Sequence, residues 1–276
     1  MTNSAPEHRL ATFAAQVRAL RVQLNTDPSL AVSIIAVKKF QAIRLAKTHA
    51  DLLVHPRYGD AAKFFLFELY GVKDFSQRDA ELARVIPTLQ RFLPSAALTV
   101  IADAVQLDAL SEQLDFLVGQ QLQTMAKQDS GIDASKTNPA DSSTPFFLAR
   151  SATMEKPIAW QRYRAAYRAV NSNAQARAMR ETQMQLVMSI GSTLNGLVRK
   201  PLLGGLLKSM GPVAIAAGVG TMHDFLTRGF TAFKAMQDAK PFLQMIQTRE
   251  QAMHDASVSS DSDLQVLQSQ NLMGLA

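Results

Sequence analysis

Residues 95–127, SAALTVIADAVQLDALSEQLDFLVGQQLQTMAK, decide the fold class of this chain. Aliphatic side chains recur here at steps of three and four residues, which is the spacing of one face of an α-helix. Pro94 and Ser95 are residue types favoured at the start of a helix. The stretch therefore predicts one long amphipathic helix that other helices can pack against. Its apolar positions are Leu98, Ile101, Val105, Leu107, Leu110, Leu114, Leu117 and Leu122.

Helical spacing continues on both sides of this stretch, and the alternation typical of strands is nearly absent. We expect one helix over 6–25 and a second from Pro28 to about His55, capped by Asp27 and ended by Pro56. Further helices are expected at 58–70, 76–92, 155–170, 173–198, 201–210, 212–236 and 241–256. The prediction is an all-α protein, a bundle of about nine to ten helices.

The segment QDSGIDASKTNPADSSTP, residues 128–145, is the clearest loop, because it is rich in Gly, Ser, Asp, Asn and Pro. A loop of this length suggests a flexible excursion or a linker between two halves. We expect an N-terminal helical half (1–127), the linker (128–149), a C-terminal helical half (150–256) and a flexible tail (257–276). A single domain is the alternative.

Composition excludes several classes of protein. The 276 residues contain no cysteine, which excludes a disulfide scaffold, thiol catalysis and thiolate metal sites. No apolar run precedes Leu10, so no signal peptide is expected. Residues 209–223 are uncharged but too few to span ~30 Å of hydrocarbon. We expect them to form a buried core helix, not a membrane-dipping segment, and we expect a cytoplasmic protein.

Basic residues are concentrated in one segment. Residues 150–208 contain ten basic and two acidic residues, a net charge of +8, whereas the whole chain carries +6. Such a segment attracts anions, unless acidic residues from elsewhere in the chain fold over it. We hypothesise that this non-enzymatic protein docks on a larger anionic protein or ribonucleoprotein complex through the basic segment. The candidate partner-binding residues are Arg162, Arg164, Arg168, Arg177, Arg180, Arg199 and Lys200.

Direct contact with nucleic acid is also possible from this segment. Aromatic and basic side chains interleave from Trp160 to Arg168, a composition that can stack bases and hold phosphates. On a helix, however, Trp160, Tyr163 and Tyr167 share one face, and ordinary amphipathic packing explains that pattern without a ligand.

Sequence motifs of catalysis, metal binding and cofactor binding were sought and not found. There is no Gly-x-Ser-x-Gly, no phosphate-binding loop and no Glu-x-x-His. His49, Asp51 and His55 lie too far apart around one straight helix to share a metal ion. We therefore expect no catalytic residue, no metal and no cofactor.

The stretch RYGDAAKFFLFELYG, residues 57–71, followed by Asp74-Phe75 and Arg78-Asp79, resembles the signature of the FFLEELY-motif family of bacterial proteins. A second block agrees with that family from Leu194 to Phe230, including Pro201-Leu202-Leu203. The two blocks cover most of the chain apart from the loop and the tail. The resemblance implies a helical fold and no assigned activity. Phe67 stands where the motif has Glu, and His223 stands where Gln is expected. These departures argue against that Glu or that Gln being an obligatory catalytic group.

The signature helix is apolar nearly all round, so it must be buried or docked. A buried Glu68 needs a cationic partner, and Arg57 or Arg78 can supply one. We predict an internal polar cluster of these three residues with Asp79. The alternative is a pocket for an apolar small molecule, which would make the protein a carrier or an enzyme. The residues of this site, structural or pocket, are Arg57, Tyr58, Phe64, Phe65, Glu68, Tyr70, Arg78 and Asp79.

Overall fold

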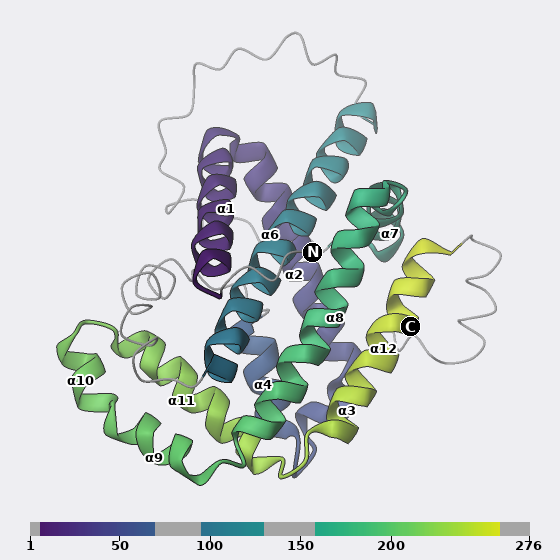
Figure 1. Ribbon diagram of the computed structural model, residues 1–276. Helices are drawn as coiled ribbons and strands as arrows, with labels where there is room; N and C mark the ends of the chain where they lie inside the picture. Colours follow the sequence, from purple (N-terminus) through teal and green to yellow (C-terminus); the bar gives the residue numbers. More distant parts are fainter. Residues whose placement is uncertain (1–5, 70–94, 130–157, 260–276) are drawn as a thin grey trace.

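The computed structural model describes residues 6–69, 95–129 and 158–259 of the chain (Figure 1). These residues form helices and the turns between them, without a strand, so the predicted all-α bundle is confirmed for the described part. The N-terminal helices are α1 (Pro6–Thr26), α2 (Pro28–Thr48), α3 (Ala50–Leu53), α4 (Gly59–Phe64) and a π-helical turn, η1 (Phe65–Leu69). The rest are α6 (Ser95–Asp129), α7 (Trp160–Asn171), α8 (Ala174–Leu197), α9 (Pro201–Ser209), α10 (Gly211–Ala216), α11 (Gly220–Ala235) and α12 (Lys240–Val258).

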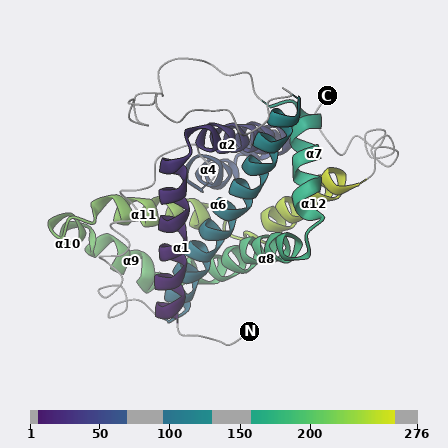
Figure 2. The same ribbon diagram turned by 90° about the horizontal axis from the view of Figure 1, so that it is seen from above.

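Helix α6 lies at the centre of the bundle, as its long apolar face predicts. It packs against α1 and α2 on one side and against α7 and α8 on the other (Figure 2). Leu114 and Val118 of α6 are fully buried. The two predicted halves of the chain therefore pack directly on each other along α6.

Polar side chains cap the N-termini of α2 and α8. The Asp27 carboxylate accepts a hydrogen bond from the Leu30 backbone N–H at 3.0 Å and starts α2 as predicted. Asn173 starts α8 in the same way, accepting from the N–H groups of Gln175 and Ala176. Helix α2 ends earlier than expected, at Thr48, and the short α3 fills the space to Leu53.

The single helix expected over residues 212–236 forms two helices, α10 and α11. The predicted helix 212–236 is broken at Gly218, whose φ of +69° lies in the left-handed region that favours glycine. The expectation that residues 209–223 form a buried core helix is wrong. Val213 and Ile215 are 64% and 72% exposed, and only one side of α10 packs on the protein, through Ala214. The helix expected at 76–92, most of the 128–145 loop and most of the 257–276 tail lie outside the described residues.

Candidate functional site

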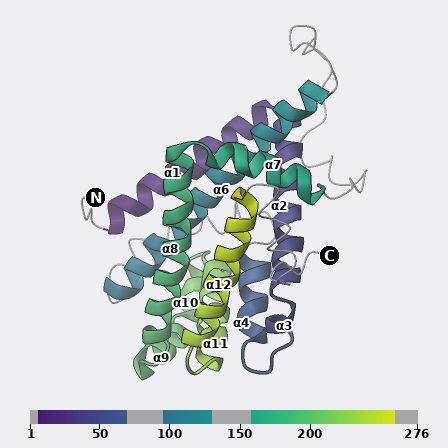
Figure 3. The ribbon, with the colours of Figure 1, turned by 90° about the vertical axis from the view of Figure 1, so that its right-hand side faces the viewer.

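A cavity of 620 Å³ lies between the helices and is partly open to solvent, with walls contributed by α2, α6, α7, α8 and α12 and with η1 at one side. Figure 3 shows α12 running between α8 on one side and α2, α3 and α4 on the other. This volume is in the range of small-molecule sites in proteins.

The lining of the cavity changes from apolar to polar along α12. Met188 of α8 and Leu243 of α12 line one end, and Arg180 of α8 and His254 of α12 line the other. Leu243 and His254 are eleven positions apart, which corresponds to ~17 Å along the helix axis. Phe65 and Leu66 of the π-helical turn and Phe242 add to the apolar end. The cavity is thus elongated, with one apolar end and one polar end.

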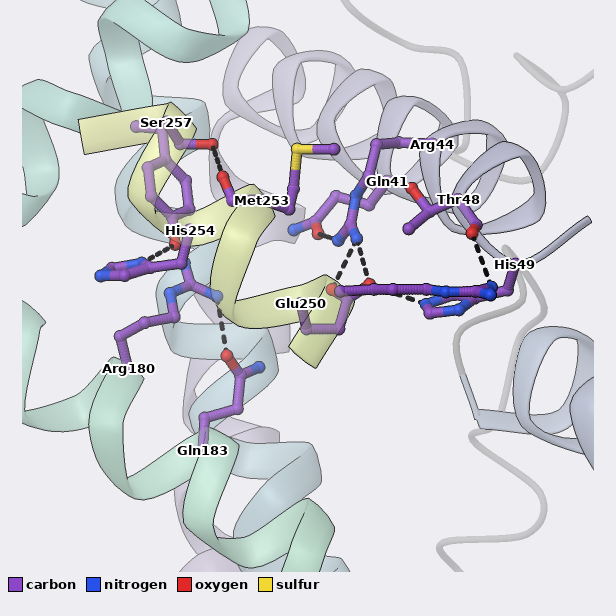
Figure 4. Close-up of polar contacts among 12 residues, drawn as sticks. Gln41, Arg44, Thr48, His49, Arg180, Gln183, Glu250, Met253, His254 and Ser257 are labelled. Carbon is purple, nitrogen blue, oxygen red and sulfur yellow. Dashed lines mark hydrogen bonds and ion pairs between the residues drawn. The ribbon is translucent and has the colours of Figure 1, made fainter. Parts of the chain in front are cut away.

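A buried ion pair joins the two walls of the cavity. Nη1 of Arg44 donates to both carboxylate oxygens of Glu250, at 2.7 and 2.5 Å, and Nε2 of His49 lies 2.8 Å from Glu250 Oε1 (Figure 4). Burial alone would raise the pKa of Glu250, but Arg44 and His49 outweigh it and hold the pKa at about 2. Glu250 is therefore a permanent anion already matched by a cation.

The polar chain continues from Arg44 to a second carboxylate. Nη2 of Arg44 donates to Gln41 Oε1 at 3.3 Å, and Nε2 of Gln41 donates to Asp115 Oδ1 at 2.8 Å. Burial raises the pKa of Asp115 to about 6; Lys38 and Arg180 oppose the shift and Glu112 adds to it. Asp115 is thus a carboxyl group that changes its charge close to neutral pH.

Arg180 is a buried cation whose hydrogen-bonding capacity is not filled. The residue is 7% exposed; Nη1 donates to Gln183 Oε1 at 2.7 Å, and the guanidinium carbon lies 4.8 Å from the centre of the Tyr167 ring. Its Nε and Nη2 atoms are buried without a hydrogen-bond partner in the described part of the chain. These two N–H groups form the edge of a guanidinium that binds a carboxylate or phosphate through two parallel hydrogen bonds. Figure 4 shows Arg180 beside His254 and Gln183.

Three further titratable groups, Tyr163, Tyr167 and His254, lie at the polar end. The Tyr167 hydroxyl lies 2.8 Å from Nδ1 of His254. Burial lowers the pKa of His254, and the Arg180 guanidinium adds to the effect. Burial also raises the pKa of Tyr163 and Tyr167, so both phenols stay protonated. The polar end therefore offers hydrogen-bond donors and a neutral imidazole to a bound molecule.

No group of three or more His, Asp or Glu residues that could hold a metal ion occurs among residues 6–69, 95–129 and 158–259. In the same residues, every helix is too short or too polar to cross a lipid bilayer.

The candidate residues of the basic segment lie in different surroundings. Arg164 is buried and donates to the carbonyl oxygens of Ala256 and Ser259, and Arg168 also reaches Ser259, so both bind the C-terminal end of α12. Arg162 pairs with Asp129 at 2.8 Å and Arg199 with Asp238 at 3.2 Å. Arg177 and Lys200 are exposed, whereas Arg180 lines the cavity. Docking through this segment stays a prediction, with Arg164 and Arg180 inside the fold.

The signature residues attach α4 and η1 to the C-terminal half. Tyr58 packs on Phe242 with ring centres 5.6 Å apart, Phe64 on Phe225 at 5.2 Å, and Phe65 on Phe233 at 5.7 Å. Nε of Arg57 donates to the Met236 carbonyl at 2.5 Å, and Glu68 pairs with Arg228 of α11 at 2.7 Å. Tyr70, Arg78 and Asp79 lie outside the described residues, so the predicted cluster as a whole stays a prediction.

Sequence reasoning missed most of the cavity's polar residues. The sequence signal that could have found them is a charged side chain on an otherwise apolar helical face. Arg44 follows Ile34 and Val37 on the buried face of α2, and Arg180 follows buried Ala176 by one turn. Neither pattern says which distant residue is the partner: Glu250 lies 206 residues from Arg44.

We expect Asp115→Asn to stabilise the protein at pH 8 and to leave stability nearly unchanged at pH 4. The folded-state pKa of about 6 is above the ordinary value of 3.8, so the wild type loses stability as pH rises through this window. Asparagine keeps the oxygen that accepts from Gln41. Thermal melting at both pH values measures the difference, and Asp60→Asn, at an exposed site on α4, should follow the wild type. An equal effect of Asp115→Asn at both pH values would rule out a raised pKa.

Comparison with known proteins gives one match. A family model described as "Domain of unknown function (DUF8198)" matches residues 20–264. No curated protein and no solved structure matches the chain.

Proposed function

Since the chain belongs to that family of unknown function, we propose from the cavity itself that the protein binds a small molecule with an apolar body and an anionic end. The observation that carries this proposal is Arg180, a guanidinium 7% exposed at the polar end of a 620 Å³ cavity. Its Nε and Nη2 have no hydrogen-bond partner among the residues that the structure describes. A buried charge with unmade hydrogen bonds is costly, and a bound anion would relieve that cost.

The other charges at the polar end favour Arg180 as the anchor. Glu250 is matched by Arg44, and Glu112 is matched by Lys38 at 2.5 Å. Asp115 also lies near Arg180, and its raised pKa indicates that its anion is poorly stabilised there. Asp108, Glu181 and Asp255 line the cavity as well. A ligand carboxylate or phosphate would bind the Nε–Nη2 edge once the guanidinium turns from the Tyr167 ring toward the cavity.

The apolar end accounts for the rest of the ligand. Phe65, Leu66, Met188, Phe242 and Ile246 line it with aromatic and flexible aliphatic surface. Methionine and leucine side chains adapt to varied apolar shapes. The ligand body would lie along α12 toward Leu243, and its burial would supply most of the binding free energy.

The test is a calorimetric titration of the full chain with three probes that share one apolar chain: decanoate, decyl phosphate and decanol. We expect the two anions to bind more tightly than the alcohol. Arg180→Met should weaken anion binding by roughly 10- to 100-fold, since a hydrogen-bonded charge contributes about 1.5–3 kcal/mol. Decanol binding should stay within about threefold, because it does not use the guanidinium.

The matched control is Arg177→Met, one turn earlier on α8 and exposed. It should bind all three probes as the wild type does. Arg180→Met should also be as stable as the wild type or more stable without ligand, because an apolar side chain of similar length replaces a buried, incompletely paired charge. Equal losses of anion binding in both variants, or no binding of any probe, would contradict the proposal.

Two further expectations stay proposals beside this one. The first is membership of the FFLEELY-motif family, which rests on the sequence of residues 57–71 and 194–230. The second is docking on a larger anionic partner in the cytoplasm, and the exposed Arg177 and Lys200 support the docking. Such docking is driven by surface charge and is weakened by salt, which distinguishes it from binding in the cavity.

A further inference from the structure

The helices α9 and α10 form an arm with α11 at one edge of the molecule (Figures 1 and 2). Large apolar side chains on this arm are unusually exposed: Leu202 at 85%, Val213 at 64% and Ile215 at 72%. Single exposed apolar residues are common on proteins, but three within fourteen positions, on two short helices at one edge of the molecule, indicate an interaction surface.

Contacts with α11 and α6 fix the position of α9 and α10, so the exposure of these side chains is a property of the folded protein. Nε2 of His223 lies 2.8 Å from the Leu207 carbonyl oxygen and joins α9 to α11. Ala214, Val219 and Met222 pack with Leu98 and Ile101 of α6. The inner side of α10 is thereby fixed, and its outer sides are directed away from the bundle.

The charged residues of α9 and α10, and of the segment that leads into α9, are all basic. No acidic residue occurs between Glu181 and Asp224, whereas Lys200 and Lys208 are exposed on either side of α9. Lysine beside exposed apolar side chains is the composition of peripheral segments that insert among anionic lipids. A symmetric contact between two copies of the arm would bring the same lysines toward each other, which disfavours a dimer through this surface.

The geometry of α10 favours a lipid interface over a flat protein surface as the partner. Val213 and Ile215 are two residues apart, so they lie ~200° apart around the helix. A flat protein face covers one of them and leaves the other in water. A lipid interface can surround both. We propose that the α10 tip, with Leu202, Lys200 and Lys208 beside it, docks peripherally on an anionic membrane surface.

The test is sedimentation of the full chain with vesicles of phosphatidylcholine, with and without phosphatidylglycerol. We expect binding to the mixed vesicles and little to the neutral ones, with loss of binding at high salt. The double variant Val213→Asp/Ile215→Asp should bind at least ~10-fold more weakly, and Lys200→Glu about 5-fold more weakly. The control is Val54→Asp, which replaces a valine 81% exposed elsewhere and should bind as the wild type does.

Thermal melting shows whether the variants fold, and all four positions are exposed, so wild-type melting is expected. Absence of wild-type binding to the mixed vesicles would overturn the proposal. So would equal binding by the double variant, or a concentration-dependent dimer that the double variant abolishes, because the surface would then bind a second copy.

Discussion

Replacing Glu250 with alanine is expected to lower the free energy of unfolding by ~3 kcal/mol at pH 7, the low end of the cost of leaving a buried charge unpaired. The side chain of Arg44 is 9% exposed and would lose both ionic hydrogen bonds, while His49 would lose its contact with Glu250. Urea denaturation measures this change. Asp255→Ala, at an exposed site on the same helix, should cost little.

The pH dependence of stability distinguishes a contribution of this ion pair from a contribution of side-chain packing. The pKa of Glu250, about 2, is below the ordinary 4.5, so its contribution is present above pH ~4.5 and is lost as pH falls toward 2. The wild type and Glu250→Ala should therefore converge in stability near pH 2. The double variant Arg44→Met/Glu250→Met should recover much of the loss, because no unpaired charge remains. A loss in Glu250→Ala that persists unchanged near pH 2 would show that packing, not charge, is responsible.

Gly119→Ala and Gly196→Ala are expected to change stability in opposite directions. A Cβ at Gly119 would lie 2.5 Å from Ile34 Cγ1 and 3.3 Å from the Ile34 backbone nitrogen, so helix α2 itself would have to shift from α6. Such overpacking costs roughly 1–3 kcal/mol.

A Cβ at Gly196 would meet no atom of the described residues within 4 Å. Alanine in a helix is favoured over glycine by about 0.5–1 kcal/mol. The same substitution thus has two separate effects: at Gly119 it tests the close contact between α2 and α6, and at Gly196 it measures helix propensity alone. Urea denaturation of both variants measures it, and destabilisation of Gly196→Ala as large as that of Gly119→Ala would contradict the packing.

Local features of the fold were predictable because they depend on neighbouring residues. The long apolar face of 95–127, the Asp27 cap and the helix starts at Pro201 and Lys240 follow from spacing and capping chemistry. The break at Gly218 was not predicted, because the apolar spacing continues across it. The helix ends there because Gly218 adopts a left-handed backbone conformation.

Features of the candidate site depend on contacts across the chain, so the sequence alone did not reveal them. The net charge of residues 150–208 treats each arginine as equivalent. The fold instead buries Arg164 at the end of α12 and Arg180 in the cavity, and leaves Arg177 in solvent. Of the signature aromatics, Tyr58, Phe64 and Phe65 pack on the C-terminal half, whereas Phe67 is 53% exposed. Phe65 also lines the cavity. The Arg44–Glu250–His49 group joins residues about 200 positions apart, which periodicity does not encode.

Native mass spectrometry of the gently purified chain tests the binding of an anionic amphiphile most directly. The protein is expected to carry one small molecule above the 30.2 kDa chain, or to take up one decanoate when incubated with it. Arg177→Met should carry the same added mass, and Arg180→Met should not. A bare chain under both conditions, or an equal adduct on Arg180→Met, would contradict the assignment of the cavity as an anion-anchored ligand site.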